Sequence, residues 1–404
     1  MNILQHKPDW IRTSEVGSFA ESTIKQRKPE IIRRILNDNE FSPGVQKNLD
    51  QFMNEITGEG APKPLQEISM DVAFWNEKLQ NLQAKSWFDL PWYFAEAFFY
   101  RKVLEAVGYY QSTEPGFMRD PFHKQKANQL EVDLQSLSGS LWLFDPADDE
   151  RTFERLIMAA LWGNRADLSH MDIDLSSPAL DLTGGTHLEI LLNDLPEILD
   201  YFSEKRHLVA YLTDNVGREL YSDLALVEYL LSNEFVENIT MLVKPAPLFV
   251  SDAMRKDVDL ALQLMRKSGN PVLNQFVDRV YALISSGRLV ILEEPSLCNY
   301  KMFEDMPFDF YRNLETFDLT IVKGDANFRR VVGDRHWDFS SAIEPIVEYF
   351  PTDVLLLRTL KSEIVVGLSE NQIETLNRKY ENWLVKGFCG VVQLIKKNQE
   401  IKNE

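Results

Sequence analysis

The sequence predicts a Rossmann-like three-layer α/β/α domain with a mostly parallel sheet, preceded by a mainly helical domain. Short apolar runs of strand length alternate with helical stretches in the second half of the chain, which is typical of parallel sheets. These runs are apolar throughout, as expected for strands that are buried on both faces. The 404 residues leave room for two domains, which we place at 1–190 and 191–404.

The first domain is predicted to be helical because its apolar residues recur at i, i+3 and i+4. The segment 92–110 is apolar on nearly every side and rich in aromatic residues, which indicates a central buried helix. We expect this domain to cover the active site at one end of the sheet. The predicted helices span residues 19–38, 68–87, 92–110 and 152–169.

The second domain is predicted to contain six short strands connected in part by amphipathic helices. The helices are expected at 218–232, 252–269 and 271–287. The strands are expected at 207–212, 238–243, 288–292, 317–322, 353–358 and 390–395.

The composition argues against several functions. Asp and Glu number 62 and Lys and Arg 43, so the net charge is −19; a chain this acidic repels nucleic acid. No apolar run reaches the length of about 18 residues that suggests a membrane span, and the first ten residues lack the apolar core of a signal peptide. The two cysteines, Cys298 and Cys389, provide neither a disulfide framework nor a cysteine metal site. We therefore expect a cytoplasmic or nuclear protein.

Polar side chains gather where the predicted strands end. In open α/β sheets, ligands bind at the carboxyl ends of the strands, so these positions are candidates for a site. The sixth strand leads into a basic tail and offers no such group. The residues that follow the first five strands are Thr213, Asp214 and Asn215; Ser251 and Asp252; Glu293 and Glu294; Lys323, Asp325, Asn327 and Arg329; and Arg358 and Lys361.

Three of these residues are candidate metal ligands. Asp214, Asn215 and Asp252 offer only oxygen atoms if the amide turns its carbonyl inward, and hard oxygen donors suit Mg, Mn and similar divalent ions. Two carboxylates and one amide leave about half of an octahedral shell for water and substrate. The set therefore suggests a catalytic metal site.

Four cationic residues could complement that metal by holding a phosphate: Lys323, Arg329, Arg358 and Lys361. A metal and a cationic clamp at one edge of a sheet suggest phosphoryl chemistry.

Simpler interpretations remain open for each motif. Asp214, Asn215 and Asp252 could be helix N-caps, residues 323–330 could be a polar loop, and Arg358 could belong to a solvated helix start. Other chemistries lack their motifs: the chain has no HExxH, no GxSxG and no P-loop. It also has no GxGxxG after the first strand, which weakens the case for a dinucleotide or S-adenosylmethionine pocket.

Several segments, in the same order along the chain, resemble the DUF89 family of metal-dependent damage-control phosphatases. The Arg-Thr-x-Lys stretch at 358–361 is similar to the signature of its eukaryotic subfamily III. Phe328 stands where a Tyr is expected, and Val216 where a small residue is expected. The segments are LTDNVGRELYSDL, FVSD, KGDANFRRVVGD and LRTLK in the second domain, and SFAESTIKQRKPEII, FAEAFFYRKVLEA and LWGNRADLS in the first.

The resemblance implies a cofactor and a substrate. It implies that Asp214, Asn215 and Asp252 bind Mn, Co or Ni in preference to Mg, and that the enzyme hydrolyses sugar phosphates such as fructose 1-phosphate and fructose 6-phosphate. The partner is then a small phosphorylated metabolite, with a monomer favoured and no nucleic acid or membrane involved. The substrate contacts expected from the strand ends and the resemblance together are Asp214, Asn215, Glu219, Lys323, Gly324, Asp325, Ala326, Asn327, Phe328, Arg329, Arg358 and Lys361.

The expected mechanism gives each group a role. The metal polarises water, and Asp325 orients or deprotonates that water. Lys361 and Lys323, with Arg329 or Arg358, neutralise charge on the phosphoryl group. Asn327 donates to a phosphate oxygen or to the sugar. Residues of the helical domain either contact the sugar or form interdomain ion pairs: Arg27, Glu96, Arg101, Asn164 and Asp167.

Two other functions stay open. Some relatives are described as S-adenosylmethionine-dependent protein carboxyl methyltransferases, and in that case Glu219 would help to hold the methyl donor. The chain could also be a non-catalytic sugar-phosphate binder.

Overall fold

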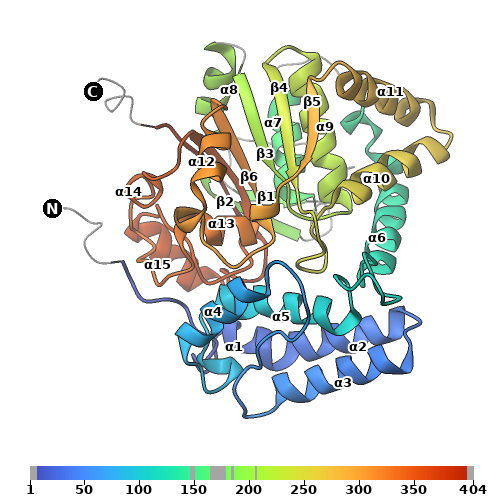
Figure 1. Ribbon diagram of the computed structural model, residues 1–404. Helices are drawn as coiled ribbons and strands as arrows, with labels where there is room; N and C mark the ends of the chain where they lie inside the picture. Colours follow the sequence, from blue (N-terminus) through green and yellow to red (C-terminus); the bar gives the residue numbers. More distant parts are fainter. Residues whose placement is uncertain (1–6, 146–150, 164–178, 183–185, 205–206, 398–404) are drawn as a thin grey trace.

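An eight-stranded sheet lies between two layers of helices, and a further group of helices packs across one end of it (Figure 1). The computed structural model describes residues 7–145, 151–163, 179–182, 186–204 and 207–397. None of the helices in these ranges is long and apolar enough to cross a membrane. The predicted fold class is confirmed.

The six predicted strands all form within two residues of their expected bounds, and two further strands precede them. Strands β3 to β7 are mutually parallel, whereas β8 is antiparallel to β7 and parallel to β2. The strands are β1 (Ala179–Leu182), β2 (Thr186–Asn193), β3 (His207–Leu212), β4 (Val236–Val243), β5 (Leu289–Glu293), β6 (Leu319–Lys323), β7 (Asp353–Thr359) and β8 (Cys389–Ile395).

The order of the strands locates the place where a ligand is expected. The sheet runs β1-β2-β8-β7-β6-β3-β4-β5. From β3 the chain builds outward through β4 to β5, and it then returns to add β6 and β7 on the other side of β3. The direction of winding therefore reverses between β3 and β6. At such a switch point the loops after the two strands separate, which leaves a crevice at their carboxyl ends.

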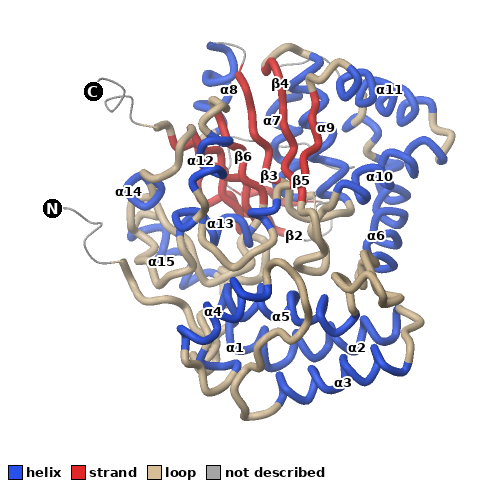
Figure 2. The backbone as a smooth tube through the Cα atoms, in the orientation of Figure 1, coloured by secondary structure: helices blue, strands red, loops and turns tan. Residues whose placement is uncertain are grey.

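Alternating side chains of β3, the middle strand of the parallel group, face the two helical layers. Val209 and Tyr211 belong to the core that includes α7 and α9, whereas Ala210 and Leu212 belong to the core that includes α12 to α14 (Figure 2). The first layer contains α7 (Thr152–Trp162), α8 (Leu195–Glu204), α9 (Arg218–Ser232), α10 (Arg255–Lys267) and α11 (Pro271–Ser285). The second contains α12 (Phe308–Leu314), α13 (Asp325–Val332) and α14 (Glu344–Val347), while α15 (Glu370–Lys379) packs with a smaller core near β8.

The N-terminal helices have a hydrophobic core of their own. The predicted central helix is confirmed: α5 (Trp92–Val107) is buried along almost its whole length. Trp75, Trp87 and Phe98 form part of an aromatic cluster around it. The group consists of α1 (Phe19–Ser22), the π-helical turn η2 (Thr23–Arg27), α2 (Lys28–Asp38), α3 (Pro43–Thr57), α4 (Val72–Leu82), the 3₁₀ turn η3 (Trp87–Asp89) and α5.

The separate core of these helices ends well before residue 190. Helix α6 (His123–Ser136) packs against α9 and α10, and α7 packs against α9 and β7, so both belong to the α/β layers. Helix α7 also ends at Trp162, and residues 164–169 of the longer predicted helix lie outside the described ranges. Helices α6 and α7, which precede residue 190, therefore complete the helix layer that α8 to α11 form after it.

Replacing Trp87 by Ala tests the aromatic core. Trp87 is fully buried, and its ring stacks on Phe98 with the centroids 5.6 Å apart. We expect the substitution to lower the free energy of unfolding by about 3–5 kcal/mol, because it leaves a cavity in a packed core. Urea denaturation followed by circular dichroism measures this change. The exposed aromatic Phe308 provides the control, since Phe308→Ala should change stability by less than about 1 kcal/mol. Equal effects of the two substitutions would contradict the burial of Trp87 in a packed core.

Candidate active site

A cavity of about 460 Å³ lies at the carboxyl ends of β3, β4, β6 and β7, under the N-terminal helices. The predicted site residues that line it are Asp214, Asn215, Asp252, Asp325, Ala326, Arg329 and Lys361. A second cavity of about 470 Å³ along α2 shares Arg27, Gln125, Val250 and Ser251 with it. Residues that follow the predicted strands therefore line a cavity, which lies at the switch point of the sheet.

The loops after β3 and β4 are joined by main-chain hydrogen bonds. The amide of Val216 donates to the Ser251 carbonyl at 2.7 Å, and the amide of Ala253 donates to the Asp214 carbonyl at 2.8 Å. Asn215 and Asp252 form an isolated antiparallel bridge between these bonds. The three candidate metal ligands therefore lie together, although they come from two separate loops.

The carboxyl group of Asp214 is buried in the cavity among other carboxylates. Its residue is 6% exposed. Burial raises its pKa well above the ordinary value, and the nearby carboxylates of Glu219 and Asp252 raise it further, against the opposing effect of Lys361 and Lys323. The cavity thus concentrates negative charge that a bound cation would relieve.

Gly324 allows the chain to pass directly against this carboxyl group. Its φ is +84°, and a Cβ atom placed there would lie 1.9 Å from Oδ2 of Asp214. Both the backbone conformation and the space therefore require glycine at the turn from β6 into α13.

The donor set fits a hard divalent cation. Two carboxylates and an amide carbonyl provide oxygen atoms only, as Mg²⁺ and Mn²⁺ prefer. Within the described ranges, no group of three or more His, Cys, Asp or Glu residues is arranged to hold a metal. A cation in this cavity would therefore depend on the amide of Asn215 as its third protein ligand. One oxygen of Asp252 is already paired with Lys244 at 2.5 Å, which leaves its other oxygen for a cation.

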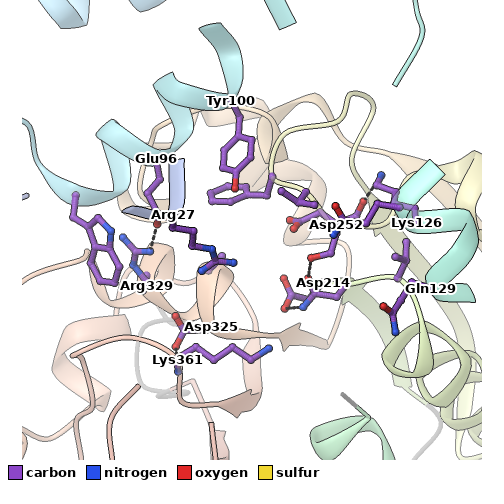
Figure 3. A pocket seen from close by; sticks show the side chains of 18 of the residues that line it. Arg27, Glu96, Tyr100, Lys126, Gln129, Asp214, Asp252, Asp325, Arg329 and Lys361 are labelled. Atoms are coloured by element: carbon purple, nitrogen blue, oxygen red, sulfur yellow. Dashed lines mark hydrogen bonds and ion pairs between the residues drawn. The ribbon is translucent and has the colours of Figure 1, made fainter. Parts of the chain in front are cut away.

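Two cationic side chains face these oxygen donors across the cavity. Figure 3 shows Lys361 and Arg27 extending from one side, with Asp214 and Asp252 on the other. Among the described residues, neither Lys361 nor Arg27 forms an ion pair. Both charges are thus available to an anionic ligand. Arg27 comes from the π-helical turn η2.

Asp325 holds the loop that carries Lys361. Its Oδ1 accepts hydrogen bonds from Nε of Arg358 at 2.9 Å, from the amide of Lys361 at 3.0 Å and from the hydroxyl of Ser362 at 3.0 Å. Arg358 is 1% exposed and stacks on the ring of Phe328. The structure thus places Arg358 behind the cavity, where it supports Asp325, and not on the cavity surface where a phosphate contact was expected.

Other expected substrate contacts also lie behind the cavity. The ammonium group of Lys323 points to Asp223 at 3.0 Å and Glu219 at 3.2 Å, away from the cavity. Burial alone would lower the pKa of Lys323, but these two carboxylates raise it above the ordinary value. Asn327 donates to the carbonyl groups of Thr213 and Lys323, which joins the loops after β3 and β6. These residues support the site without lining it.

Arg329 lines the cavity, but its charge is balanced. It donates to Asp334 and to Glu96, and its guanidinium lies 3.5 Å from the ring centroid of Trp92. Glu96 also accepts from Lys28 at 2.8 Å. The Glu96–Arg329 pair therefore connects the N-terminal helices to α13, as the interdomain alternative predicted.

The other N-terminal candidates lie elsewhere. Arg101 pairs with Glu67 and Asp71 within the N-terminal helices, whereas Asn164 and Asp167 lie outside the described residues.

Several residues that line the cavity were not predicted from the sequence. Helix α6 contributes Gln125, Lys126 and Gln129, and Tyr100 comes from the buried face of α5. Lys126 is buried and forms ion pairs with Asp120 and Asp257, which are remote from each other in sequence. A local pattern cannot reveal residues whose role depends on packing between distant helices.

Replacing Glu96 by Gln tests the interdomain ion pair through pH. Burial would raise the pKa of Glu96, but Lys28 and Arg329 outweigh it and lower the pKa to about 2 from 4.5. The unfolded chain therefore binds this proton first as the pH falls. The stabilisation, on the order of 3 kcal/mol, should be complete above pH 4.5 and lost toward pH 2. Unfolding of both proteins between pH 7 and pH 3 measures the difference, which should shrink as the pH falls.

The surface pair of Arg266 and Asp278 provides the control for this experiment. Asp278→Asn removes an exposed carboxylate and should leave the stability within error of the wild type. A Glu96→Gln protein that is as stable as the wild type at pH 7 would show that the pair does not stabilise the packing of the helices on α13.

Comparison with known proteins identifies relatives along almost the whole chain. A family model described as the damage-control phosphatase ARMT1-like domain matches residues 23–376. The chain is 28% identical to the damage-control phosphatase ARMT1 of Macaca fascicularis over 437 residues, which covers 96% of this chain and 98% of the relative. The human protein of the same name is also 28% identical, with the same coverage. Among solved structures, a DUF89 family protein from Pyrococcus horikoshii aligns with a TM-score of 0.48 and 13% identity, covering 93% of this chain and 97% of that one.

Proposed function

The chain belongs to the damage-control phosphatase ARMT1-like family, and from this premise we propose that it is a metal-dependent phosphatase of small phosphate esters such as fructose 1-phosphate and fructose 6-phosphate. The resemblance noted in the sequence is confirmed by that membership, and membership supports phosphatase activity in general. The observation that carries the finer proposal is that oxygen donors face, in one cavity, two cations that form no ion pair among the described residues.

The residues for a divalent cation are Asp214, Asn215 and Asp252. A cation there would act as a Lewis acid toward a phosphate oxygen and lower the pKa of a bound water. The raised pKa of Asp214 supports this assignment, because a buried carboxyl group surrounded by other carboxylates favours any added positive charge.

The cationic side of the cavity binds the phosphoryl group in this proposal. Lys361 and Arg27 would pair with its oxygens, and the amide groups that begin α13 at Ala326 offer further donors to an anion. One oxygen of Asp325 accepts three hydrogen bonds, so its first role is to position Lys361. Its other oxygen remains the candidate for orienting the attacking water.

The N-terminal helices would exclude bulk water from the reaction. Trp92 and Tyr100 of α5 form part of the cavity wall, and Phe249 contributes a third ring. Apolar walls of this kind strengthen the electrostatic interactions between ligand and protein. The hydroxyl groups of a sugar would meet Glu96, Gln125 and Gln129, which also line the cavity.

Replacing a metal ligand should abolish activity. Asp214→Asn and Asp252→Asn each remove one carboxylate, and we expect hydrolysis to fall by at least about 100-fold, because each carboxylate is a ligand in its own right. The measurement is phosphate release from fructose 1-phosphate and p-nitrophenyl phosphate with Mn²⁺, Co²⁺, Ni²⁺, Mg²⁺ or EDTA. Asp278→Asn, an exposed acid-to-amide change, provides the matched control. Full activity of both site variants, or of the wild type in EDTA, would refute the metal assignment.

The same preparation separates phosphatase from methyltransferase. Calorimetric titration with S-adenosylmethionine should give no binding if the cavity serves phosphate esters alone. Micromolar binding of S-adenosylmethionine, without phosphate release under any metal, would favour the methyltransferase instead.

Replacing Lys361 by Met should weaken substrate binding and turnover while leaving metal binding intact. The loss of one charge-assisted hydrogen bond, worth about 1.5–3 kcal/mol, should lower kcat/KM by about 10- to 100-fold. Steady-state kinetics with fructose 1-phosphate give this ratio, and Mn²⁺ titration gives the metal affinity. Lys47→Met, on the exposed surface of α3, should behave as the wild type. An unchanged kcat/KM in Lys361→Met would exclude Lys361 from the phosphate site.

A further inference from the structure

Glu219 lies behind the predicted metal ligands and contacts one of them directly. It is the second residue of α9, and it is 6% exposed. Its Oε2 accepts a hydrogen bond from Nδ2 of Asn215 at 3.1 Å. Its Oε1 lies 3.2 Å from the ammonium group of Lys323. The carboxylate of Glu219 therefore connects Asn215, a proposed metal ligand, to Lys323, a buried cation that does not reach the cavity.

The contact with Glu219 determines which way the amide of Asn215 points. Its NH₂ group lies between two carboxylate oxygens, Oδ2 of Asp214 at 2.6 Å and Oε2 of Glu219 at 3.1 Å. Glu219 is ion-paired with Lys323, and a carboxylate in such a pair accepts hydrogen bonds and does not donate them, so the NH₂ end must point to Glu219. The carbonyl oxygen is thereby directed to the opposite side, where it accepts from the hydroxyl of Ser251. Only that oxygen could bind a cation.

Lys323 holds Glu219 in place. Its ammonium group contacts Glu219, Asp223 and the carbonyl oxygen of Ala160, and it is 1% exposed. Asp223, one turn further along α9, accepts a second hydrogen bond from the hydroxyl of Tyr211. Glu219 and Asp223 thus share the same buried cation, but of the two, within the described part of the chain, only Glu219 also contacts Asn215.

We propose that Glu219 is a positioning residue that orients the amide of Asn215 toward the metal, with Lys323 as its anchor. This inference rests on the proposed metal-dependent function. A cation bound to Asp214 would compete for Oδ2 of Asp214, which now accepts a hydrogen bond from the amide of Asn215. Glu219 would then be the acceptor that holds the NH₂ group of Asn215. Partners of this kind, behind the ligands, commonly contribute 10- to 100-fold to metal affinity.

The test compares two acids that share one lysine. Glu219→Ala and Asp223→Ala each remove one partner of Lys323, but only the first removes the acceptor for Asn215. Glu219→Gln keeps an acceptor oxygen at the same position. Mn²⁺ alone is titrated into each protein by calorimetry, and the Mn²⁺-induced shift of Tm gives a second measurement. Circular dichroism verifies folding, and Glu219→Met replaces Glu219→Ala if the latter does not fold.

We expect Glu219→Ala to raise the Kd for Mn²⁺ by about 10- to 100-fold. Asp223→Ala should keep the wild-type Kd within about threefold despite a lower Tm, and Glu219→Gln should recover most of the affinity. Equal losses in Glu219→Ala and Asp223→Ala, or no recovery in Glu219→Gln, would overturn the positioning role. Absence of Mn²⁺ binding in the wild type would instead refute the metal-dependent function itself.

Discussion

The position of Asp214 is the constraint on which the site depends. Its carboxyl group is buried at the switch point between β3 and β6, with Gly324 in contact on one side and the loop of Asp252 hydrogen-bonded on the other. Burying a carboxyl group among other carboxylates is costly unless something compensates the charge. The protein supplies Lys361 and Lys323 nearby, yet the pKa of Asp214 stays high. The architecture therefore maintains a local excess of acid where the proposed cation and phosphate would meet.

Four cationic side chains lie around the carboxyl group of Asp214. Lys323 and Lys244 each pair with a carboxylate of the acidic side, whereas Lys361 and Arg27 face the cavity without an ion pair among the described residues. Buried pairs cancel their own charge, so they give rigidity more than attraction. In the proposed function Lys361 and Arg27 attract the phosphate, within a chain whose net charge of −19 would otherwise repel it.

The sequence predicted the strands and the location of the site because both depend on local patterns. Apolar runs located the six later strands, and the residues that follow them included the acidic and cationic groups of the cavity. The edge strand β1 and its neighbour β2 were missed, since they lack a long apolar run. The sequence alone also could not predict whether a side chain at a strand end points into the cavity or away from it. Lys323 and Lys361 are both cations at strand ends, but only the packing of α9 decides that the first turns away from the cavity.

The π-helical turn Thr23–Arg27 has a consequence for the phase of the N-terminal helix. A π turn accommodates one extra residue, and one residue corresponds to about 100° of rotation around a helix. In the present phase Arg27 lines the cavity while the adjacent Lys28 is buried against Glu96. The wider turn absorbs that rotation, so α1 and α2 keep nearly the relative phase of one continuous helix. Phe19 before the turn and Arg27 at its end therefore both reach the cavity, although the turn holds one residue more than an α-helical turn.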